Sequence, residues 1–318
     1  MSVDFTYFHK ERFNNLTDLN LSFSFDLFIS FCNQSSRVKD VLEGINSSRK
    51  VLFYDAESLD ISSYENFKIS NRELEDIKRF FDEFKLNSTM KICLDITGFT
   101  VPYILLFLKF FQKNNISNFY VIYSEPNYYK DKSKTKFSDD FIEVKQVEGY
   151  RGMHSSDESN DYLIIGSGYD YSSIIEVCKH KENVHKKHQL FGFPSLQPDM
   201  YQENILKIYD AKNTLNFENI NDPELNLFAP ANDPFVTAQE IMSFIEKNDK
   251  VKKITNIYLS PISTKAQALG FGLYYIWKNC DKEPISIIFP YCNKMYGNTS
   301  EGLSKISVYN IELPKLVV

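Results

Sequence analysis

Short apolar runs recur along the whole chain, separated by polar loops and by longer segments with helical spacing. The runs expected to form strands are Phe25–Phe31, Lys50–Tyr54, Met90–Leu94, Asn118–Tyr123, Phe141–Val147, Asp161–Ile165, His188–Phe193, Ile254–Ser260 and Ile285–Pro290. Several of them are apolar at nearly every position, which is typical of strands covered on both faces. Their alternation with helical segments predicts βαβ units and a mostly parallel sheet.

Three further segments have the composition or spacing of helices. Arg72–Phe84 places apolar residues every three or four positions, as in a helix with one buried face. Pro234–Glu246 shows the same spacing, with Asp233 expected as its N-cap and Pro234 at its first position. Phe99–Phe111 is the longest apolar stretch, and it is shorter than the ~20 residues that span a bilayer, so we expect a buried helix.

Chain length and one polar segment suggest how the fold is organised. A chain of 318 residues suits two domains of ordinary size or one large sheet. The segment 209–233 is rich in Asn, Asp and Pro, as expected of a linker. We therefore expect a three-layer, Rossmann-like α/β fold with a mostly parallel sheet in residues 1–208, and a second, smaller α/β region in residues 234–318. Two separate domains and one continuous sheet are both compatible with the sequence.

Charge and cysteine content narrow the functional classes. The net charge of −6 argues against a dedicated DNA or RNA binder, which usually carries a basic face. A small nucleotide ligand is still compatible, since a few local donors can hold one phosphate group. The five cysteines are widely spaced and form no CxxC pair, so we expect free thiols in a reducing cytoplasm and no metal site. The polar N-terminus predicts no signal peptide, and we expect no membrane segment.

Polar residues that follow strands are the first candidates for a binding site, because open parallel sheets bind ligands at the carboxyl ends of their strands. Asp95, Thr97 and Gly98 follow the strand Met90–Leu94. The carboxylate could accept a hydrogen bond from a ribose hydroxyl, and Gly98 would let a ligand approach the backbone closely. The alternative is that Asp95 only caps the next helix.

Ser263, Thr264 and Lys265 form a second candidate site, where a strand leads into a helix. Two hydroxyls, one ammonium group and the helix N-terminus would converge there on one anion. The Gly-x4-Gly-Lys frame of a P-loop is missing. We expect Thr264 or Lys265 to lie on a concave surface, within reach of Asn293 or Lys294. The alternative is a capped packing helix with an exposed Lys265.

A third candidate lies between the strand Asp161–Ile165 and the following helix, in Gly166-Ser-Gly-Tyr-Asp170. Small residues before a helix N-terminus can form an anion site. The spacing from Asp170 to Glu176 is similar to that of nucleoside deoxyribosyltransferases, in which a Glu on this helix attacks the anomeric carbon. Glu176 is therefore the candidate catalytic nucleophile, and Glu125 is a second candidate carboxylate. The alternative is that Asp170 simply caps the helix.

The segment that begins with Asp26-Leu-Phe-Ile-Ser30, and continues through a polar loop and a helix to Tyr54-Asp55, resembles the start of a TIR domain. The resemblance covers the first two strands and the helix between them. TIR enzymes also need a catalytic Glu on a later helix, and no Glu of this chain is assigned to that position. A generic Rossmann-like strand, loop and helix is the alternative.

Two loops resemble parts of CARF-like sensor domains, which bind cyclic oligonucleotides. Asp95-Ile-Thr-Gly98 is similar to their Asp-x-Thr-Gly turn, although Phe99 follows where those domains continue Gly-Gly-Thr-Lys. Ser263-Thr-Lys265 is similar to their Thr-Lys loop. With Tyr123–Pro126 and Phe191–Pro194, these residues resemble Rossmann-like proteins encoded beside bacterial antiphage systems.

These resemblances imply a protein that senses or degrades nucleotides during phage defence. The first hypothesis is a binding module for a nucleotide-like ligand, with NAD or another nucleotide as the candidate. The second is an enzyme that cleaves the N-glycosidic bond of NAD or a nucleoside. The third is a structural subunit that contacts nearby-encoded proteins or further copies of itself through Tyr128-Tyr129 and Tyr291–Tyr296, because Tyr is enriched at interfaces.

Overall fold

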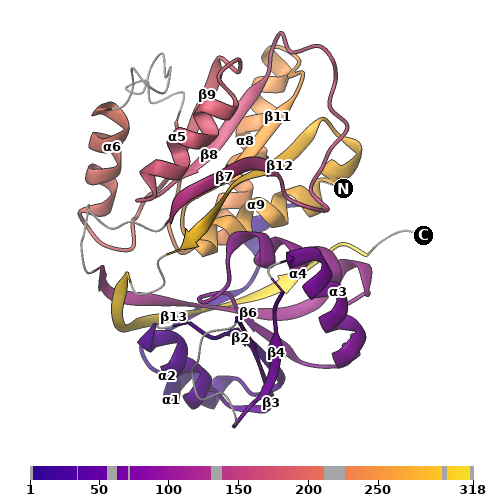
Figure 1. Cartoon of the computed structure of the whole chain (residues 1–318), viewed down its shortest axis with the longest axis vertical. Coiled ribbons are helices and arrows are strands. Elements are labelled where there is room, and N and C mark those ends of the chain that lie inside the picture. The colour runs from indigo at the N-terminus through magenta and orange to yellow at the C-terminus, as the bar shows by residue number, and fades with distance from the viewer. Residues whose placement is uncertain are drawn as a thin grey trace. The chain divides into compact units, whose positions relative to one another are not determined.

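The computed structural model describes residues 3–33, 35–55, 63–70, 72–129, 138–210, 226–295 and 299–315. The chain divides into two compact units (Figure 1). Unit 1 comprises Met1–Thr6 and Asp131–Tyr296, and unit 2 comprises Tyr7–Lys130 and Gly297–Val318. These bounds differ from the predicted division into 1–208, a linker at 209–233 and 234–318. The predicted linker falls inside unit 1, and residues 211–225 of it lie outside the described residues.

Unit 2 contains the following elements in chain order: β1 (Lys10–Phe13), α1 (Leu16–Ser22), β2 (Phe25–Phe31), α2 (Ser36–Gly44), β3 (Ser47–Tyr54), β4 (Glu65–Lys68), α3 (Glu73–Phe84), β5 (Ile92–Asp95), α4 (Val101–Lys113), β6 (Asn118–Tyr129) and β13 (Ser300–Glu312). Its strands are ordered β1-β13-β6-β5-β2-β3-β4. The strands β2 to β6 are parallel, whereas β13 is antiparallel to β6 and β1 is antiparallel to β13. The parallel part therefore has the 3-2-1-4-5 order of a doubly wound sheet.

Unit 1 contains these elements in chain order: β7 (Ser138–Gln146), β8 (Tyr162–Ser167), α5 (Tyr171–His180), β9 (Lys186–Gly192), α6 (Met200–Asp210), β10 (Asn226–Ala229), α8 (Pro234–Val251), β11 (Ile257–Pro261), α9 (Lys265–Trp277) and β12 (Ile285–Met295). Short 3₁₀ helices occupy Phe5–Tyr7 and Cys280–Lys282. The strands are ordered β10-β9-β8-β11-β12-β7, all parallel except β7. The parallel strands again follow the 3-2-1-4-5 order.

Each sheet has one antiparallel strand that comes, along the chain, directly after the last parallel strand of the other unit. β6 ends the parallel series of unit 2, and the next strand along the chain, β7, pairs with β12 in unit 1. β12 ends the parallel series of unit 1, and the next strand, β13, pairs with β6 in unit 2. The two units thus share one topology, including the antiparallel strand beside the fifth parallel strand. Neither half of the sequence corresponds to one unit.

Helices cover both faces of each sheet and form three layers. In unit 2, Val41 of α2 packs with Phe28 and Ile122 on one face, whereas on the other face the ring of Phe53 lies 4.7 Å from that of Phe80 in α3. In unit 1, α5 and α6 pack on the face that carries Leu163 and Ile165. α8 and α9 lie on the opposite face, where His188 of β9 contacts Phe244 of α8. The predicted three-layer, Rossmann-like α/β class is confirmed.

The predicted strands are all present, and β6 and β12 extend furthest beyond their predicted ends. β6 runs to Tyr129 and β12 to Met295, because each pairs beyond the parallel sheet with an antiparallel neighbour. Pro126 fits inside β6 since its partner Leu303 lies at an irregularity of the β13 register. Asp233 caps α8 as predicted, accepting hydrogen bonds from the amides of Phe235 and Val236.

Candidate ligand-binding site

The carboxyl ends of β8 and β11 mark the switch point of the unit 1 sheet. β8 is the first parallel strand, and chain connections lead from it to β9 on one side and, later, to β11 on the other. Loops leaving neighbouring strands in opposite directions open a crevice at such a point, which is where doubly wound sheets bind ligands. The β8–α5 and β11–α9 loops meet there, and both were singled out by the sequence.

The β11–α9 loop presents the N-terminus of α9. Thr264 is the N-cap, and its hydroxyl accepts a hydrogen bond from the amide of Gln267 and donates one to the carbonyl of Ala231. Lys265 is the first helical residue and is half-buried. Thr264 therefore serves as a helix cap, as the alternative interpretation held, and Lys265 adds a positive charge to the positive end of the helix dipole.

Two buried oxygen atoms beside this N-terminus have no hydrogen-bond partner in the part of the chain that the structure describes. They are Oγ of Ser263 and Oε1 of Gln267. Gln267 lies in the first turn of α9, and its side chain is fully buried. The amide nitrogen of Gln267 donates to the carbonyl of Ala229 at 3.2 Å, which fixes Oε1 as an acceptor facing away from that carbonyl. Leaving a buried polar atom unpaired costs about 1–3 kcal/mol. Unpaired buried polar atoms therefore call for a partner from outside the chain, such as an ordered water, an ion or a ligand.

Glycines in the neighbouring strands make room for these atoms. A Cβ at Gly166, in β8, would lie 2.8 Å from Oγ of Ser263. A Cβ at Gly192, the last residue of β9, would lie 2.9 Å from the Cβ of Ala231 and 3.6 Å from Oε1 of Gln267. A side chain at either glycine position would fill the space beside the unpaired oxygens. Because both residues are glycines, no side chain of β8 or β9 occupies that space.

The β8–α5 loop is less suited to an anion than its glycines suggest. Asp170 stands at the N-terminus of α5, and its carboxylate accepts hydrogen bonds from the hydroxyls of Ser173, at 2.7 Å, and Ser138. A carboxylate already occupies the positive end of this helix dipole. An anionic ligand would therefore favour the α9 side of the crevice.

Glu176 lies six residues further along, in the second turn of α5. Its carboxylate pairs with Lys179 at 2.8 Å, and a third of its side chain is exposed. This is the geometry of an ordinary i,i+3 pair on a helix surface. Glu125, the other carboxylate, belongs to unit 2, where it is buried in β6 and forms an ion pair with Arg12.

Asp95, Thr97 and Gly98 lie in unit 2, at its own switch point between β2 and β5. Asp95 is fully buried and accepts hydrogen bonds of 2.9 Å from the Ser30 hydroxyl and the Thr97 amide. The Thr97 hydroxyl accepts from the amide of Ser124 in β6. These side chains tie three strands together. The alternative interpretation, in which Asp95 caps the next helix, does not hold, because Thr100 is the N-cap of α4.

Asn293 was expected near Lys265, and the structure shows it in β12 with its amide donating to Asp140 at 3.1 Å. The side chain of Lys294 lies outside the described residues. The expected approach of either residue to Lys265 stays a prediction.

The cysteines are free thiols, as predicted. Burial raises the pKa of Cys178 to about 12 and raises the pKa of Cys93 well above its usual value. Both thiols are therefore protonated at neutral pH and inert as nucleophiles. The described residues contain no cluster of His, Cys, Asp or Glu that could hold a metal ion.

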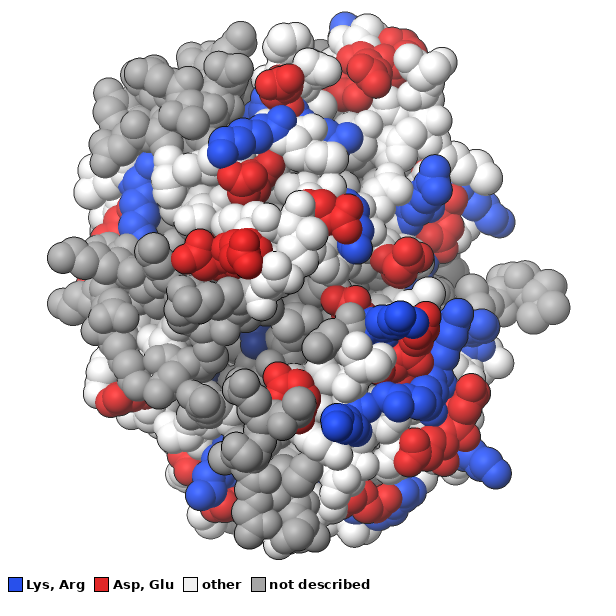
Figure 2. Space-filling view, viewed as in Figure 1, with Lys and Arg blue, Asp and Glu red and all other residues white. Residues whose placement is uncertain are grey.

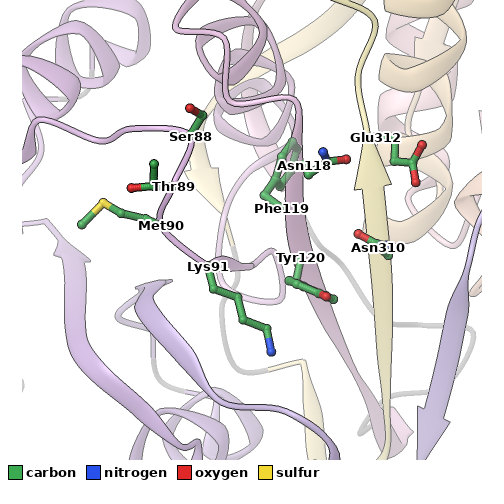
Figure 3. Close-up of a pocket in the computed structure, with 9 residues that line it drawn as sticks. All are labelled: Ser88, Thr89, Met90, Lys91, Asn118, Phe119, Tyr120, Asn310 and Glu312. Atoms are coloured by element: carbon green, nitrogen blue, oxygen red, sulfur yellow. The ribbon is translucent and has the colours of Figure 1, made fainter.

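A hollow of about 430 Å³ lies at the opposite edge of the unit 2 sheet (Figure 3). It is lined by the residues before β5, the start of β6 and the end of β13. The Lys91 ammonium lies 5.4–5.6 Å from the ring centres of Phe23, Phe25 and Tyr120, so aromatic faces already engage this cation. The amino edge of a doubly wound sheet is not its ligand edge, and the crevice in unit 1 is the better candidate.

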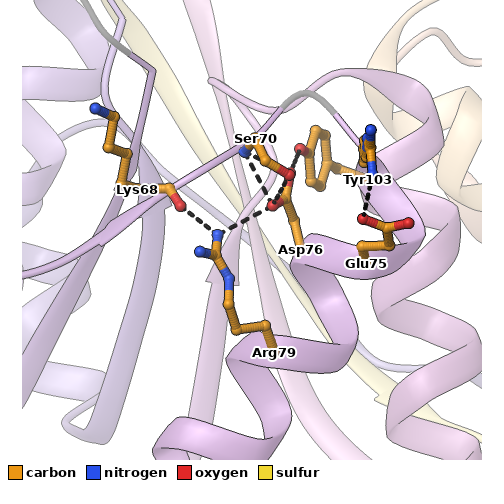
Figure 4. A network of polar contacts seen from close by, with 7 residues as sticks. Lys68, Ser70, Glu75, Asp76, Arg79 and Tyr103 are labelled. Atoms are coloured by element: carbon orange, nitrogen blue, oxygen red, sulfur yellow. Dashed lines mark hydrogen bonds and ion pairs between the residues drawn. The ribbon is translucent and has the colours of Figure 1, made fainter.

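Asp76 is the centre of a polar network that reasoning from the sequence missed (Figure 4). This fully buried carboxylate of α3 accepts hydrogen bonds from the amide and hydroxyl of Ser70, from the Tyr103 hydroxyl at 2.7 Å and from Arg79 at 3.0 Å. Burial, followed by the bond to Asp76, raises the pKa of Tyr103. All the acceptor capacity of Asp76 is used inside the protein, so the network joins β4, α3 and α4.

Charged side chains are mixed on one face of the molecule. On the face shown in Figure 2, acidic and basic side chains of the described residues are interspersed. Among the described helices, none is long and apolar enough to cross a membrane.

Compared with known proteins, the chain matches no family model, and no curated protein is significantly similar to it in sequence.

Proposed function

We propose that the protein binds a small nucleotide-like ligand in unit 1, at the carboxyl ends of β8 and β11. The observation that carries this proposal is a pair of buried oxygens beside the N-terminus of α9, Oγ of Ser263 and Oε1 of Gln267, for which the described residues provide no hydrogen-bond partner. They lie at the switch point of a doubly wound sheet, next to glycine positions that keep the strand edge bare.

The chemistry of the site favours a ligand with both an anionic and a hydrogen-bond-donating part. The α9 N-terminus and Lys265 suit a phosphate group. Oε1 of Gln267 is fixed as an acceptor and needs a donor, such as a ribose hydroxyl or a base amino group. A nucleotide carries both kinds of group, whereas inorganic phosphate at neutral pH is mainly an acceptor.

The sequence resemblances to CARF-like and TIR domains favour the same ligand class. We extend the proposal accordingly to a nucleotide-sensing component of bacterial antiphage defence. Glu176 enters this proposal only as a surface residue of α5, since its partner is Lys179.

Calorimetric titration of the full chain with ATP, NAD and a cyclic oligoadenylate tests the proposal. We expect at least one of them to bind, and Lys265→Ala to weaken that binding about tenfold, the effect of one charge-assisted contact. Lys278→Ala is the matched control, because Lys278 lies at the other end of α9 and pairs with Glu246. Absence of binding to all three, or equal binding by the Lys265 variant, would overturn the proposal.

A further inference from the structure

Unit 2 repeats the topology of unit 1, so it has a switch point of its own at the carboxyl ends of β2 and β5. The first helix after that point is α2, and its N-terminus is open. Ser35 is the N-cap, and its side chain makes no capping hydrogen bond. Among the described contacts, neither the amide of Ser36 nor that of Arg37 has a partner. These N–H groups form the positive end of the helix dipole.

Arg37 adds a full positive charge to the first turn of α2. Its guanidinium donates to the carbonyl of Ser124, in β6, and to the hydroxyl of Ser35. Among the described contacts of Arg37, none is to a carboxylate. The nearby Glu125 is paired with Arg12, and Asp95 is fully engaged by Ser30 and Thr97. The guanidinium of Arg37 is therefore positioned by hydrogen bonds to neutral oxygens, which do not compensate its positive charge.

A second, independent observation lies beneath this helix start. The side chain of Ser124 is completely buried, and no described residue forms a hydrogen bond with its Oγ. Ser124 points to the same face of β6 as Ile122, two residues earlier, and Ile122 packs against Val41 and Leu42 of α2. The unpaired hydroxyl of Ser124 thus faces α2, and the carbonyl of the same residue accepts a hydrogen bond from Arg37. A buried hydroxyl in this place needs an acceptor that the described residues do not supply.

We propose that this cluster, made of Ser35, Ser36, Arg37 and Ser124, is a binding site for a phosphate group. The free amides and the guanidinium supply donors and charge for the phosphate oxygens, and the Ser124 hydroxyl donates to one of them. The site is separate from the one proposed in unit 1, because it uses a different sheet and a different helix. The chain then has two anion sites, one at the switch point of each unit.

Equilibrium dialysis of the full chain with radiolabelled pyrophosphate counts these sites and measures their affinities. We expect Arg37→Gln to lose one class of site, or to weaken it about tenfold. Lys39→Gln is the matched control, because Lys39 lies on the same helix, is exposed and pairs with Glu43. Lys265→Gln reports on unit 1 and leaves the unit 2 site unchanged. Arg37→Lys, which retains the charge, should bind more tightly than Arg37→Gln.

Ser124→Ala gives a readout that a purely structural role would not produce. Removing an unpaired buried hydroxyl should raise the melting temperature of the free chain and lower the stabilisation that pyrophosphate provides. A structural hydroxyl would instead give a lower melting temperature and an unchanged response to pyrophosphate. That result overturns the proposal, and so does unchanged pyrophosphate binding by a folded Arg37→Gln variant.

Discussion

The Nε2 atom of His154 accepts a hydrogen bond from the hydroxyl of Ser286. This direction follows from the other contacts of the two residues. The Ser286 hydroxyl already accepts from the side chain of Gln146 and the amide of Gly152, each at 3.1 Å, so its proton is left for His154. The Nδ1 atom of His154 donates to Oδ1 of Asn256, whose amide nitrogen is itself a donor to three oxygens. The neutral imidazole fits both contacts.

This arrangement predicts that stability falls in mild acid. Burial is the largest effect on His154 and lowers its pKa below the usual 6.5, so the unfolded chain takes up a proton before the folded one does. The contribution is complete above about pH 6.5, the unfolded pKa, and is lost as the pH falls toward the folded pKa. Urea unfolding between pH 7.5 and 5 should show this loss in the native protein.

The variant His154→Gln should lose that part of the pH dependence, and should also be about 1–3 kcal/mol less stable at neutral pH because Ser286 and Asn256 lose a partner. His185→Gln is the control, since His185 is exposed. The lowered pKa of His180 is common to the native protein and both variants and cancels in the comparison. A His154→Gln variant with the full acid sensitivity of the native protein would show that another group is responsible.

Asp76→Asn tests the buried network of unit 2. The substitution removes the negative charge beside Arg79 and turns one acceptor oxygen into a donor that faces the donors of Ser70 and Tyr103. We expect a loss of about 3–5 kcal/mol in the free energy of unfolding, more than the ~1–3 kcal/mol for one unsatisfied buried group, because several donors lose their acceptor at once. Tyr103→Phe removes a single hydrogen bond and should cost about 1–3 kcal/mol. Equal costs for the two variants would mean that Asp76 is not the centre of the network.

Gly98→Ala tests whether the close approach of this loop to β2 requires glycine. A Cβ at Gly98 would lie 2.4 Å from the carbonyl oxygen of Phe31, a contact that only a backbone shift can relieve. We expect the variant to lose about 1–3 kcal/mol of stability, the usual cost of overpacking. Gly168→Ala is the comparison, since its nearest contact would be 3.2 Å and its cost should be smaller. Thermal unfolding of both variants measures the difference.

The alternation of apolar runs and helical segments predicted the fold class because the strands are buried on both faces and carry few polar residues. β1, β4 and β10 escaped prediction since each has only four residues, three of them polar in β1 and β4. β13 escaped prediction since polar residues interrupt its apolar ones. The division into units was out of reach because the chain passes from one unit to the other after β6 and again after β12. Such crossings leave no signal in local composition.

The candidate site was predicted in part for a similar reason. Thr264 and Lys265 were found because a hydroxyl and an ammonium before a helix form a local pattern. Gln267 and Gly192 were missed, since their importance depends on contacts between separate strands and α9. Arg37 was missed because its role follows from the carboxylates near it being paired elsewhere, and pairing over long sequence distances cannot be seen in the sequence.

Thr264 links the capping of α9 to the geometry of the proposed site in unit 1. Its hydroxyl accepts from the amide of Gln267 and donates to the carbonyl of Ala231, so it joins the helix start to the loop after β10. Thr264→Ala should lower the free energy of unfolding by about 1–2 kcal/mol, the usual value of an N-cap, and Thr264→Ser should restore most of it. Chemical unfolding of the three proteins measures this. If Thr264→Ala also weakens nucleotide binding while Thr264→Ser does not, the cap holds the first turn of α9 in position for the ligand. A Thr264→Ala variant as stable as the native protein would show that the α9 N-terminus is held by other contacts.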